Sequence, residues 1–498
     1  MTTHEAPVQP ARYEPVIGLE VHAQLQTATK AFCGCPTAYS AVPNTSTCPV
    51  CLGHPGTLPV LNREMVTFAI MLGLATDCTI RRESGFARKH YFYPDLPKGY
   101  QITQYDDPIC HGGHIDIERA DGQLTRIGLT RIHMEEDAGK SIHGIGTDTL
   151  VDFNRCGVPL LEIVSEPDLR SARDAHTYLT LLRQILTYLG ICDGNMEEGS
   201  LRCDANISLR RIGDTAFGTR TELKNLNSFR NVERAIEFEI ARHAAILDAG
   251  GTVLQETMQW DAGRGVTVAM RGKEESHDYR YFPEPDLVPV LVDDAWIARA
   301  LTAIQELPSA RRDRFARDLG LPRYDADVLT AEKPLADYFE AVVEALSPRS
   351  PEKIKAASNW VMGELLRVLK ETHRELPDAP LQPEALAQLL DLIAVGSISG
   401  KIAKDIFEEL VTTGAMPADI VARRGLAQIS DAPTLAPLVD AILAANMESV
   451  RKYLAGRENI FGFFVGQVMK LTKGQANPDI ATDLVKRALE VIREGGEG

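Results

Sequence analysis

The sequence predicts an α+β protein in which an antiparallel sheet is followed by a wholly helical region. Up to about residue 300, several short segments alternate apolar and polar residues, which is typical of strands with one buried face. Beyond that point apolar residues recur at helical spacing, and links containing Pro and Gly separate the segments. A chain of 498 residues is too long for one ordinary core, so we expect two to four domains.

The composition indicates an ordinary globular protein, with 44% hydrophobic and 24% charged residues. A net charge of −16 argues against a general nucleic-acid coat, although a partner that docks through shape and a few cations is not excluded. No apolar run is long enough to cross a bilayer, and the N-terminus is polar and Pro-rich, unlike a signal peptide. We therefore expect a cytoplasmic protein with no membrane partner and a disordered leader over residues 1–12.

The first predicted strand covers residues 16–25. Its odd positions from 17 onward are apolar, and the opposite face carries Glu20, His22 and Gln24 in a row. Such a face is ordinarily solvated, but a glutamate and a histidine two residues apart also suit a metal site.

Four of the nine cysteines form two close pairs, Cys33 with Cys35 and Cys48 with Cys51. This spacing favours a structural zinc knuckle, in which four thiolates close a tetrahedron. The first pair is tighter than the usual C-x2-C, and free thiols or a disulfide are the alternatives.

Residues 62–76 and 171–190 have helical spacing, and between them lies a loop rich in aromatic residues, prolines and cations. Its cations, Lys89 among them, could face a phosphate or a carboxylate, or water.

The segment RIHMEEDAGK (131–140) places three acids between Arg131 and Lys140, after an alternating stretch. It is either an acidic turn in water or part of a divalent-metal or phosphoryl-transfer site. Glu162 interrupts the apolar strand 158–164, where a lone acid is costly to bury unless it is paired or bound to a metal.

Residues 200–209 alternate again, and residues 222–224 form a further short segment. The polar strand faces together offer the following acids, histidine and cations: Glu20, His22, Glu136, Glu162, Asp204, Glu222, Lys89, Arg202 and Lys224. An antiparallel sheet carrying them would suit a magnesium–nucleotide site, although alternation alone does not show that they converge. Standard nucleotide motifs are absent: residues 396–401 (GSISGK) are one residue short of a P-loop and suit a helix cap, with Ser397 or Ser399 as N-cap.

Helices are predicted at 336–346, 354–369, 383–394 and 402–410, then, beyond a boundary at Gly414–Pro417, at 433–445, 447–454, 461–472 and 478–493. In the last group Arg451, Lys452, Lys470 and Lys473 could contact a phosphate backbone or be solvated.

From about Tyr13 to the C-terminus, eight segments in consistent order resemble the B subunit of the tRNA-dependent aspartyl/glutamyl amidotransferase. They are VIGLEVHAQL, HYFYPDLPKGYQITQ, HMEEDAGK, LLEIVSEPD, MEEGSLRCDANISL, ELKNLNS, DYRYFPEPDL and GFFVGQVMKLTKGQANP. The resemblance implies a glutamine-dependent carbon–nitrogen ligase acting in translation on Asp-tRNA(Asn), Glu-tRNA(Gln) or both. ATP would phosphorylate the side-chain carboxylate, and ammonia made from glutamine by an amidase A subunit would displace the phosphate. A small C subunit would complete a heterotrimer.

The resemblance also implies roles for residues. His22, Glu136 and Glu162 would bind Mg²⁺, with Glu136 preferred to Glu135 as the inward-facing member of that pair. Glu20, Lys89 and Asp204 would be catalytic neighbours, and Lys89, Arg202 and Lys224 would contact the nucleotide. The zinc knuckle occurs in only some members of the family, and this chain has all four cysteines.

The family's organisation implies a cradle domain over residues 13–300 that is similar to the glutamine synthetase catalytic fold and includes the knuckle at 33–51. A helical domain at 301–414 and a tRNA-binding tail at 415–498 would follow. Two other functions are open: a non-catalytic tRNA-binding adaptor, and a small-molecule ligase similar to glutamine synthetase, which the long helical third disfavours.

Overall fold

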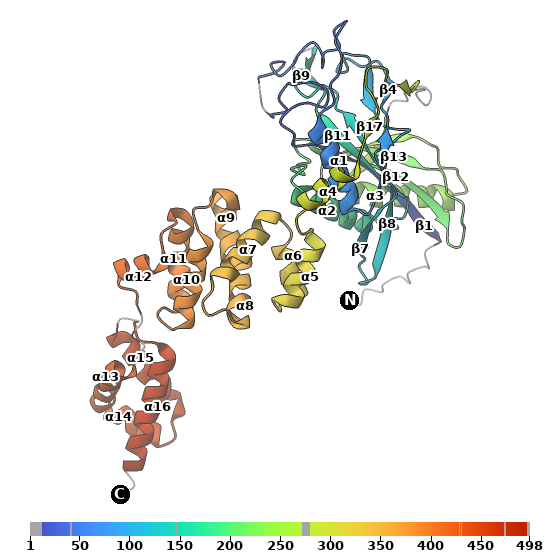
Figure 1. Ribbon diagram of the computed structural model, residues 1–498. Helices are drawn as coiled ribbons and strands as arrows, with labels where there is room; N and C mark the ends of the chain where they lie inside the picture. Colours follow the sequence, from blue (N-terminus) through green and yellow to red (C-terminus); the bar gives the residue numbers. More distant parts are fainter. Residues whose placement is uncertain are drawn as a thin grey trace. The chain divides into compact units, whose positions relative to one another are not determined.

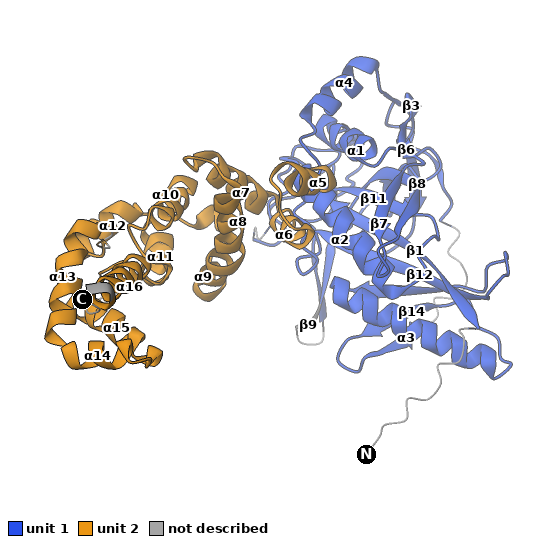
Figure 2. Ribbon diagram, turned by 90° about the horizontal axis from the view of Figure 1, so that it is seen from below, with its two compact units in different colours: residues 1–308 blue, residues 309–498 orange. Residues whose placement is uncertain are grey.

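The computed structural model describes residues 12–39, 42–145, 148–270, 279–427, 429, 431–472 and 475–495. Apart from Arg12, the expected disordered leader lies outside these residues. The chain forms two compact units, residues 1–308 (unit 1) and 309–498 (unit 2), which Figure 2 shows in different colours. Among the described residues, no helix combines the length and the apolar character needed to cross a membrane.

Unit 1 is built on a 13-stranded sheet whose main path runs β15-β14-β13-β12-β1-β11-β8-β5-β4-β16. In that order the strands are Val266–Ala269, Thr257–Asp261, Thr221–Leu226, Leu201–Arg211, Tyr13–Gln24, Pro159–Ser165, Leu124–Glu136, Tyr100–Thr103, Ala87–His90 and Phe282–Pro283. Beside this path lie β2 (Thr79–Ile80), β6 (Cys110–His111) and β7 (His114–Glu118). Two small ribbons pair β9 (Lys140–Ile145) with β10 (Asp148–Asp152) and β3 (Glu83–Ser84) with β17 (Val290–Leu291).

The α+β class is confirmed, but the sheet is mixed rather than wholly antiparallel. Strand β14 runs parallel to β13, because the two are joined through a long crossover that contains a helix. The strands that carry the predicted polar faces, from β13 to β4, pair antiparallel with one another.

Helices α1 (Arg63–Ala75), α2 (Ala172–Tyr188) and α3 (Phe229–Asp248) pack on the sheet, and α4 (Asp294–Ala303) packs on α1 (Figure 1). Asn62, Ser171 and Ser228 cap the N-termini of the first three helices through their side-chain oxygens. Apolar residues of the strands and of these helices form one continuous core. With one face covered in this way, the polar residues of the strands are left on the other face.

Helix α3 was not among the elements expected from the sequence. Two of its buried positions hold Glu239 and His243, which interrupt the apolar stripe that marks a packed helix. These side chains form a buried polar network: Glu239 bonds with Arg242 at 2.8 Å and His243 at 3.2 Å, and it accepts a hydrogen bond from Thr221 at 3.0 Å. The network therefore adds polar contacts between α3 and β13 to the apolar packing of this helix.

Unit 2 consists of helices in the part that the structure describes. The first group packs around one core and comprises α5 (Pro308–Asp318), α6 (Arg323–Leu329), α7 (Lys333–Ala345), α8 (Pro351–Trp360), α9 (Leu366–Thr372), α10 (Pro383–Ala394), α11 (Gly400–Thr413) and α12 (Pro417–Arg424). The second group has a core of its own and comprises α13 (Ala432–Ala445), α14 (Met447–Leu454), α15 (Phe461–Leu471) and α16 (Pro478–Gly495). Short 3₁₀ turns lie at Leu376–Asp378 and Glu458–Ile460.

Three local features refine the predicted helices. The segment predicted as one helix at 354–369 contains a π-helical turn at Val361–Leu365 between α8 and α9. Ser399 caps α11 by accepting a hydrogen bond from Ile402 N, so the near P-loop sequence forms a helix N-terminus. Gly414 ends α11 in the left-handed conformation, and α12, which follows it, still contributes Ile420 and Val421 to the first helical core.

Candidate active site

The polar residues predicted on β1 meet those of its neighbouring strands. Glu20 lies opposite Asp204 of β12, and His22 lies opposite both Arg202 of β12 and Glu162 of β11. Directly opposite residues in an antiparallel pair have their side chains on the same face, at contact distance. The register therefore brings together side chains that are up to about 180 residues apart in the chain.

At the centre of this face, His22 lies between two carboxylates. Its Nε2 is 3.4 Å from Oε1 of Glu135 and 3.2 Å from Oε2 of Glu162. His133 stands behind them, with its Nε2 3.8 Å from Glu135 and 3.5 Å from Glu162. Arg131 approaches the other oxygen of Glu162 at 3.6 Å. Glu162, the acid that interrupts an apolar strand, is thus paired rather than isolated.

The histidine and the two carboxylates of this cluster stabilise one another's charged forms. Burial alone lowers the pKa of a histidine, but hydrogen bonds to Glu135 and Glu162 raise the pKa of His22 to about 10. Burial raises the pKa of Glu135, yet hydrogen bonds from His133 and His22 hold that pKa well below its usual value. The pKa of Glu162 is also lowered, because the charge of His133 and the hydrogen bond from His22 outweigh burial. Two ionised carboxylates therefore share a proton on an imidazole.

The same donor set fits a divalent cation. Ligand atoms of His22, Glu135 and Glu162 all lie within 4.8 Å of one another, and their side chains come from three adjacent strands. Carboxylate oxygens are the ligands that Mg²⁺ prefers, and a neutral imidazole is a common ligand of metal ions in proteins. A cation between the carboxylates would take over the role of the shared proton, so the residues are chemically suited to one.

Glu135, and not Glu136, belongs to this cluster. Glu136 is the member of the pair predicted from the sequence, and the geometry contradicts that prediction. Apolar residues occupy odd positions at Ile127 and Leu129 but even positions at Ile132 and Met134, because the pairing of β8 with β11 shifts between Leu129 and Arg131. A β-bulge of this kind reverses which side chains face the core.

Glu136 points to the core side of the sheet, toward the cysteine loops. Its carboxylate forms an ion pair with Lys98, accepts a hydrogen bond from Ile102 N at 3.1 Å, and is almost fully buried. It lines a small cavity together with Cys33 and Cys51. Glu136 is therefore a neighbour of the cysteine cluster rather than of His22.

A second polar group lies on the β12 and β13 side of His22. Lys224 Nζ is 3.0 Å from both Asp204 and Glu222, and these acids raise the pKa of Lys224 despite its burial. Glu20 accepts a hydrogen bond from Asn206 at 3.0 Å. Burial, followed by the negative charges of Glu162, Asp204 and Glu222, raises the pKa of Glu20 above its usual value. Glu20 is thus better suited to hold a proton than Glu135 and Glu162, whose pKa values are lowered.

Arg202 is oriented by Asp137, an acid that was not among the predicted site residues. The guanidinium of Arg202 donates to Asp137 at 2.7 Å, and Gln24 donates to the same carboxylate oxygen, also at 2.7 Å. Arg155 lies 3.5 Å from that oxygen. Asp137 therefore fixes two cations at one edge of the polar face.

A cavity of about 910 Å³ opens over these residues. Of the predicted site residues, it is lined by His22, Lys89, Arg202, Asp204 and Lys224; Glu135 and Asp137 line it as well. Glu20, Glu162 and Glu222 are not among the lining residues, although each contacts a neighbour on this face. A volume of this size accommodates a nucleotide-sized ligand.

Lys89 enters the cavity from β4. Its Nζ lies 4.7 Å from the centre of the Tyr279 ring, a cation–π arrangement. The segment that carries Tyr279 is fixed by the preceding residue on β4, Arg88, which donates to Glu284 at 2.8 and 2.9 Å and to Asp286 at 2.9 Å. The Glu284 side chain is fully buried, so this bidentate pair holds the segment 279–286 against β4.

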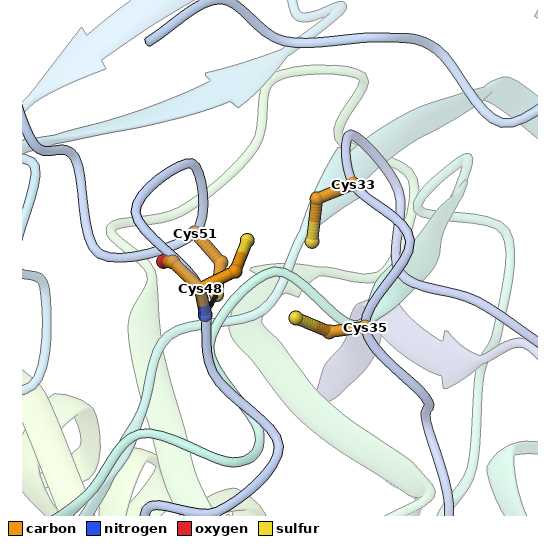
Figure 3. Close-up of side chains that lie close together, drawn as sticks. All are labelled: Cys33, Cys35, Cys48 and Cys51. Atoms are coloured by element: carbon orange, nitrogen blue, oxygen red, sulfur yellow. Dashed lines mark hydrogen bonds between the residues drawn. The ribbon is translucent and has the colours of Figure 1, made fainter.

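The four clustered cysteines form a separate site on unit 1. Figure 3 shows their sulfurs directed toward one another, Cys33 and Cys35 from one loop and Cys48 and Cys51 from the next. All four sulfurs lie within 4.8 Å of one another, close to the spacing of about 3.8 Å expected around a tetrahedral ion with bonds of about 2.3 Å. All four are free thiols in the structure. The residues fit a closed structural zinc site.

Lys30 is a feature of this site that the sequence pattern did not reveal. Its side chain is fully buried, and its Nζ donates to Ser46 O at 2.7 Å and contacts Cys51 Sγ at 3.7 Å. The hydrogen bond with Cys33, the Cys48 N–H and the charge of Lys30 together lower the pKa of Cys51 to about 4. A buried ammonium suits a cluster of thiolates because it offsets their negative charge.

The fold and the site define a class of protein: an α+β chain whose sheet carries an imidazole–carboxylate cluster beside a large cavity, followed by helical modules. The chain matches the family described as "GatB/GatE catalytic domain" over residues 15–298 and the "GatB domain" over residues 337–489. It belongs to the family of the B subunits of the aspartyl/glutamyl-tRNA(Asn/Gln) amidotransferases.

Curated proteins with this subunit name match the chain over nearly their whole length. The B subunit from Trichlorobacter lovleyi is 57% identical over 478 residues, which cover 96% of this chain and 99% of that protein. The B subunit from Chlorobium phaeobacteroides is likewise 57% identical, with the same coverage, and that from Geobacter sulfurreducens is 55% identical over 96% of this chain and 99% of its own length.

Proposed function

We propose that this chain is the subunit that activates and amidates the side-chain carboxylate of Asp-tRNA(Asn), Glu-tRNA(Gln) or both. The observation that carries the proposal is the His22–Glu135–Glu162 cluster at the edge of a nucleotide-sized cavity, in a chain whose relatives are named for this amidotransferase. In this function, the chain would be one subunit of a glutamine-dependent carbon–nitrogen ligase.

The reaction has two steps. A carboxylate is a poor acyl donor, so one of its oxygens first attacks the γ-phosphorus of ATP and ADP leaves, which gives an acyl phosphate. Ammonia then attacks the carbonyl carbon, phosphate departs with the carboxylate oxygen, and the nitrogen loses a proton to leave the amide. Both steps build charge on phosphoryl or carbonyl oxygens, so cations close to these oxygens accelerate them.

The polar face supplies groups for each step. His22, Glu135 and Glu162 would hold Mg²⁺, which neutralises phosphate charge when bound. Lys89 lines the same cavity as His22 and Glu135 and is suited to stabilise the transferred phosphoryl group, while Arg202 and Lys224 are suited to contact the nucleotide. Glu20, whose pKa is raised, is suited to accept the proton that ammonia loses, with Asp204 beside it.

Partners complete the proposal. Ammonia would come from glutamine through an amidase A subunit, and a small C subunit would complete a heterotrimer with it. The cradle that binds ATP would be comparable to the glutamine synthetase catalytic domain. The last helices, α13 to α16, would contact the tRNA by its shape, with Arg451, Lys452 and Lys470 close to phosphates. Lys473, the fourth cation predicted there, lies outside the described residues.

The experiment that tests the proposal is reconstitution of the chain with its A and C partners. With ATP, Mg²⁺, glutamine and Asp- or Glu-charged tRNA, we expect phosphate release that depends on charged tRNA and falls strongly in Glu162→Ala. Normal turnover in that variant would remove Glu162 from the site. In a non-catalytic tRNA adaptor, phosphate release would not depend on any residue of the cluster. The close pairing of these residues does not favour the adaptor function.

A further inference from the structure

Phe92 is the most exposed large apolar side chain among those that the structure describes, at 91%. It is also one of the residues that line the large cavity, and its neighbour Tyr93 is 48% exposed. Exposed apolar surface beside a substrate cavity is a common sign of a contact that forms on binding. Neither ring has a role in the phosphoryl transfer described above.

The loop that follows Phe92 is stiffened, and the ring lies against Gly99. Two prolines, Pro94 and Pro97, stiffen the loop that follows it, and Gly99 N donates to Leu96 O at 3.0 Å to close a turn. A Cβ added to Gly99, which has φ +74°, would lie 3.2 Å from Cε1 of Phe92. The ring therefore lies close to the Gly99 backbone, and the positive φ of Gly99 favours glycine at that position.

The surroundings of Phe92 combine an aromatic face with positive charge. Lys89 and His90 lie just before it on β4, and Arg280 lines the same cavity. Segment 279–283 is joined to β4 by a hydrogen bond from His90 N to Tyr279 O at 2.8 Å and by the stacking of His90 on Phe282 at 4.8 Å. A flat apolar face beside cations is the combination that binds single-stranded nucleic acid.

We propose that Phe92 is the stacking platform for a base in the single-stranded 3′ end of the tRNA substrate. This inference rests on the proposed function. The reacting carboxylate belongs to an amino acid esterified to the terminal ribose, so the terminal nucleotides must lie within about one amino-acid length of the cavity. Phe92 is the most exposed aromatic ring among the residues that line this cavity, and base–aromatic stacking tolerates any base.

The base of ATP shares this stacking chemistry, so the test separates the two sources. In the reconstituted complex, the KM for charged tRNA is measured at saturating ATP and the KM for ATP at saturating charged tRNA. We expect Phe92→Ala to raise the KM for charged tRNA about tenfold and to leave the KM for ATP unchanged. Phe92→Tyr should behave as the wild type, because it keeps the ring.

Phe217 provides a matched control: it is 62% exposed on the same unit and does not line the cavity. Phe217→Ala should leave both constants unchanged. A second readout does not need turnover. In Phe92→Trp, the fluorescence of the new indole should be quenched by uncharged tRNA and not by Mg-ATP. Since the ring is at the surface, thermal unfolding of these variants should match the wild type.

A rise in the KM for ATP instead, or quenching by Mg-ATP alone, would assign the ring to the base of ATP and overturn the inference. Unchanged constants in Phe92→Ala, together with no quenching of Phe92→Trp, would overturn it too. If the wild-type complex released no phosphate in response to charged tRNA, the proposed function would fail; quenching by tRNA would then still report the stacking site.

Discussion

Replacing Glu135 with glutamine tests the metal cluster most sharply, because the variant keeps the shape of the side chain and removes one charge. The carboxylate lies 3.4 Å from His22 and beside Glu162. At about 4 Å and an effective dielectric constant of about 20, one unit-charge interaction is worth about 4 kcal/mol, or roughly a thousandfold in affinity. We therefore expect the Mg²⁺ concentration for half-maximal phosphate release to rise by about two to three orders of magnitude.

The adjacent residue provides the control. Glu136→Gln breaks the ion pair with Lys98, in which the side chains are only 2% and 7% exposed. Breaking a buried pair costs about 3–5 kcal/mol of stability, so this variant should unfold at lower temperature and keep the Mg²⁺ dependence of the wild type. The opposite pattern, with Mg²⁺ dependence altered by Glu136→Gln and not by Glu135→Gln, would refute the assignment of Glu135 of β8 to the metal cluster.

Three further predictions concern the cysteine cluster, the buried network on α3 and the second helical core. Purified protein should contain about one equivalent of zinc by metal analysis, and Cys51→Ser should lose it; less than half an equivalent in the wild type, without chelators, would contradict four-thiolate binding. Glu239→Gln should lower the free energy of unfolding by about 3–5 kcal/mol, whereas the exposed Glu237→Gln should not. The pKa of Glu239 is lowered from its ordinary value of 4.5 to about 2. Its contribution to the free energy of unfolding should therefore be complete above about pH 4.5 and disappear as the pH falls toward 2, as measured by denaturant unfolding. A pH-independent difference in stability between the wild type and Glu239→Gln would contradict this. Deleting residues 431–498 removes the second helical core and leaves α12 in place, so tRNA binding measured by filter retention should weaken while the remainder stays folded; unchanged affinity would exclude a role for these helices in binding tRNA.

The sequence predicts the polar faces of β1 and β12 correctly, because strict alternation specifies which residues share a face. Glu20, His22 and Gln24 are all partly exposed between fully buried neighbours, as expected. The alternation in the sequence does not show which strands are adjacent. The contact between His22 and Glu162 therefore could not be predicted without the strand order of the folded sheet. On β8 a single bulge reversed the choice between Glu135 and Glu136. The change of apolar positions from odd to even between Leu129 and Ile132 was the available signal.

The rest of the fold differs from expectation where polar residues are buried. Helix α3 has Val232, Ala235 and Ile236 at helical spacing, so periodicity was an available signal for the helix itself. Periodicity could not show that Glu239 and His243 are buried on its packed face, or that Lys30 is buried beside Cys51. Local capping was easier to predict, since Ser399 forms its bond within one helical turn. Contacts that depend on distant segments, such as that between Lys89 and Tyr279, carry no local signature.

Phosphorylation of the substrate carboxylate before its amidation can be tested by following the oxygen atoms of that carboxylate. Charged tRNA is prepared with ¹⁸O in the side-chain carboxylate of its amino acid, and the phosphate released by the reconstituted complex is analysed by mass spectrometry. Because phosphate leaves with the oxygen that attacked ATP, we expect one ¹⁸O atom in each phosphate released with an amide product. Phosphate without ¹⁸O, formed together with the amide, would contradict it.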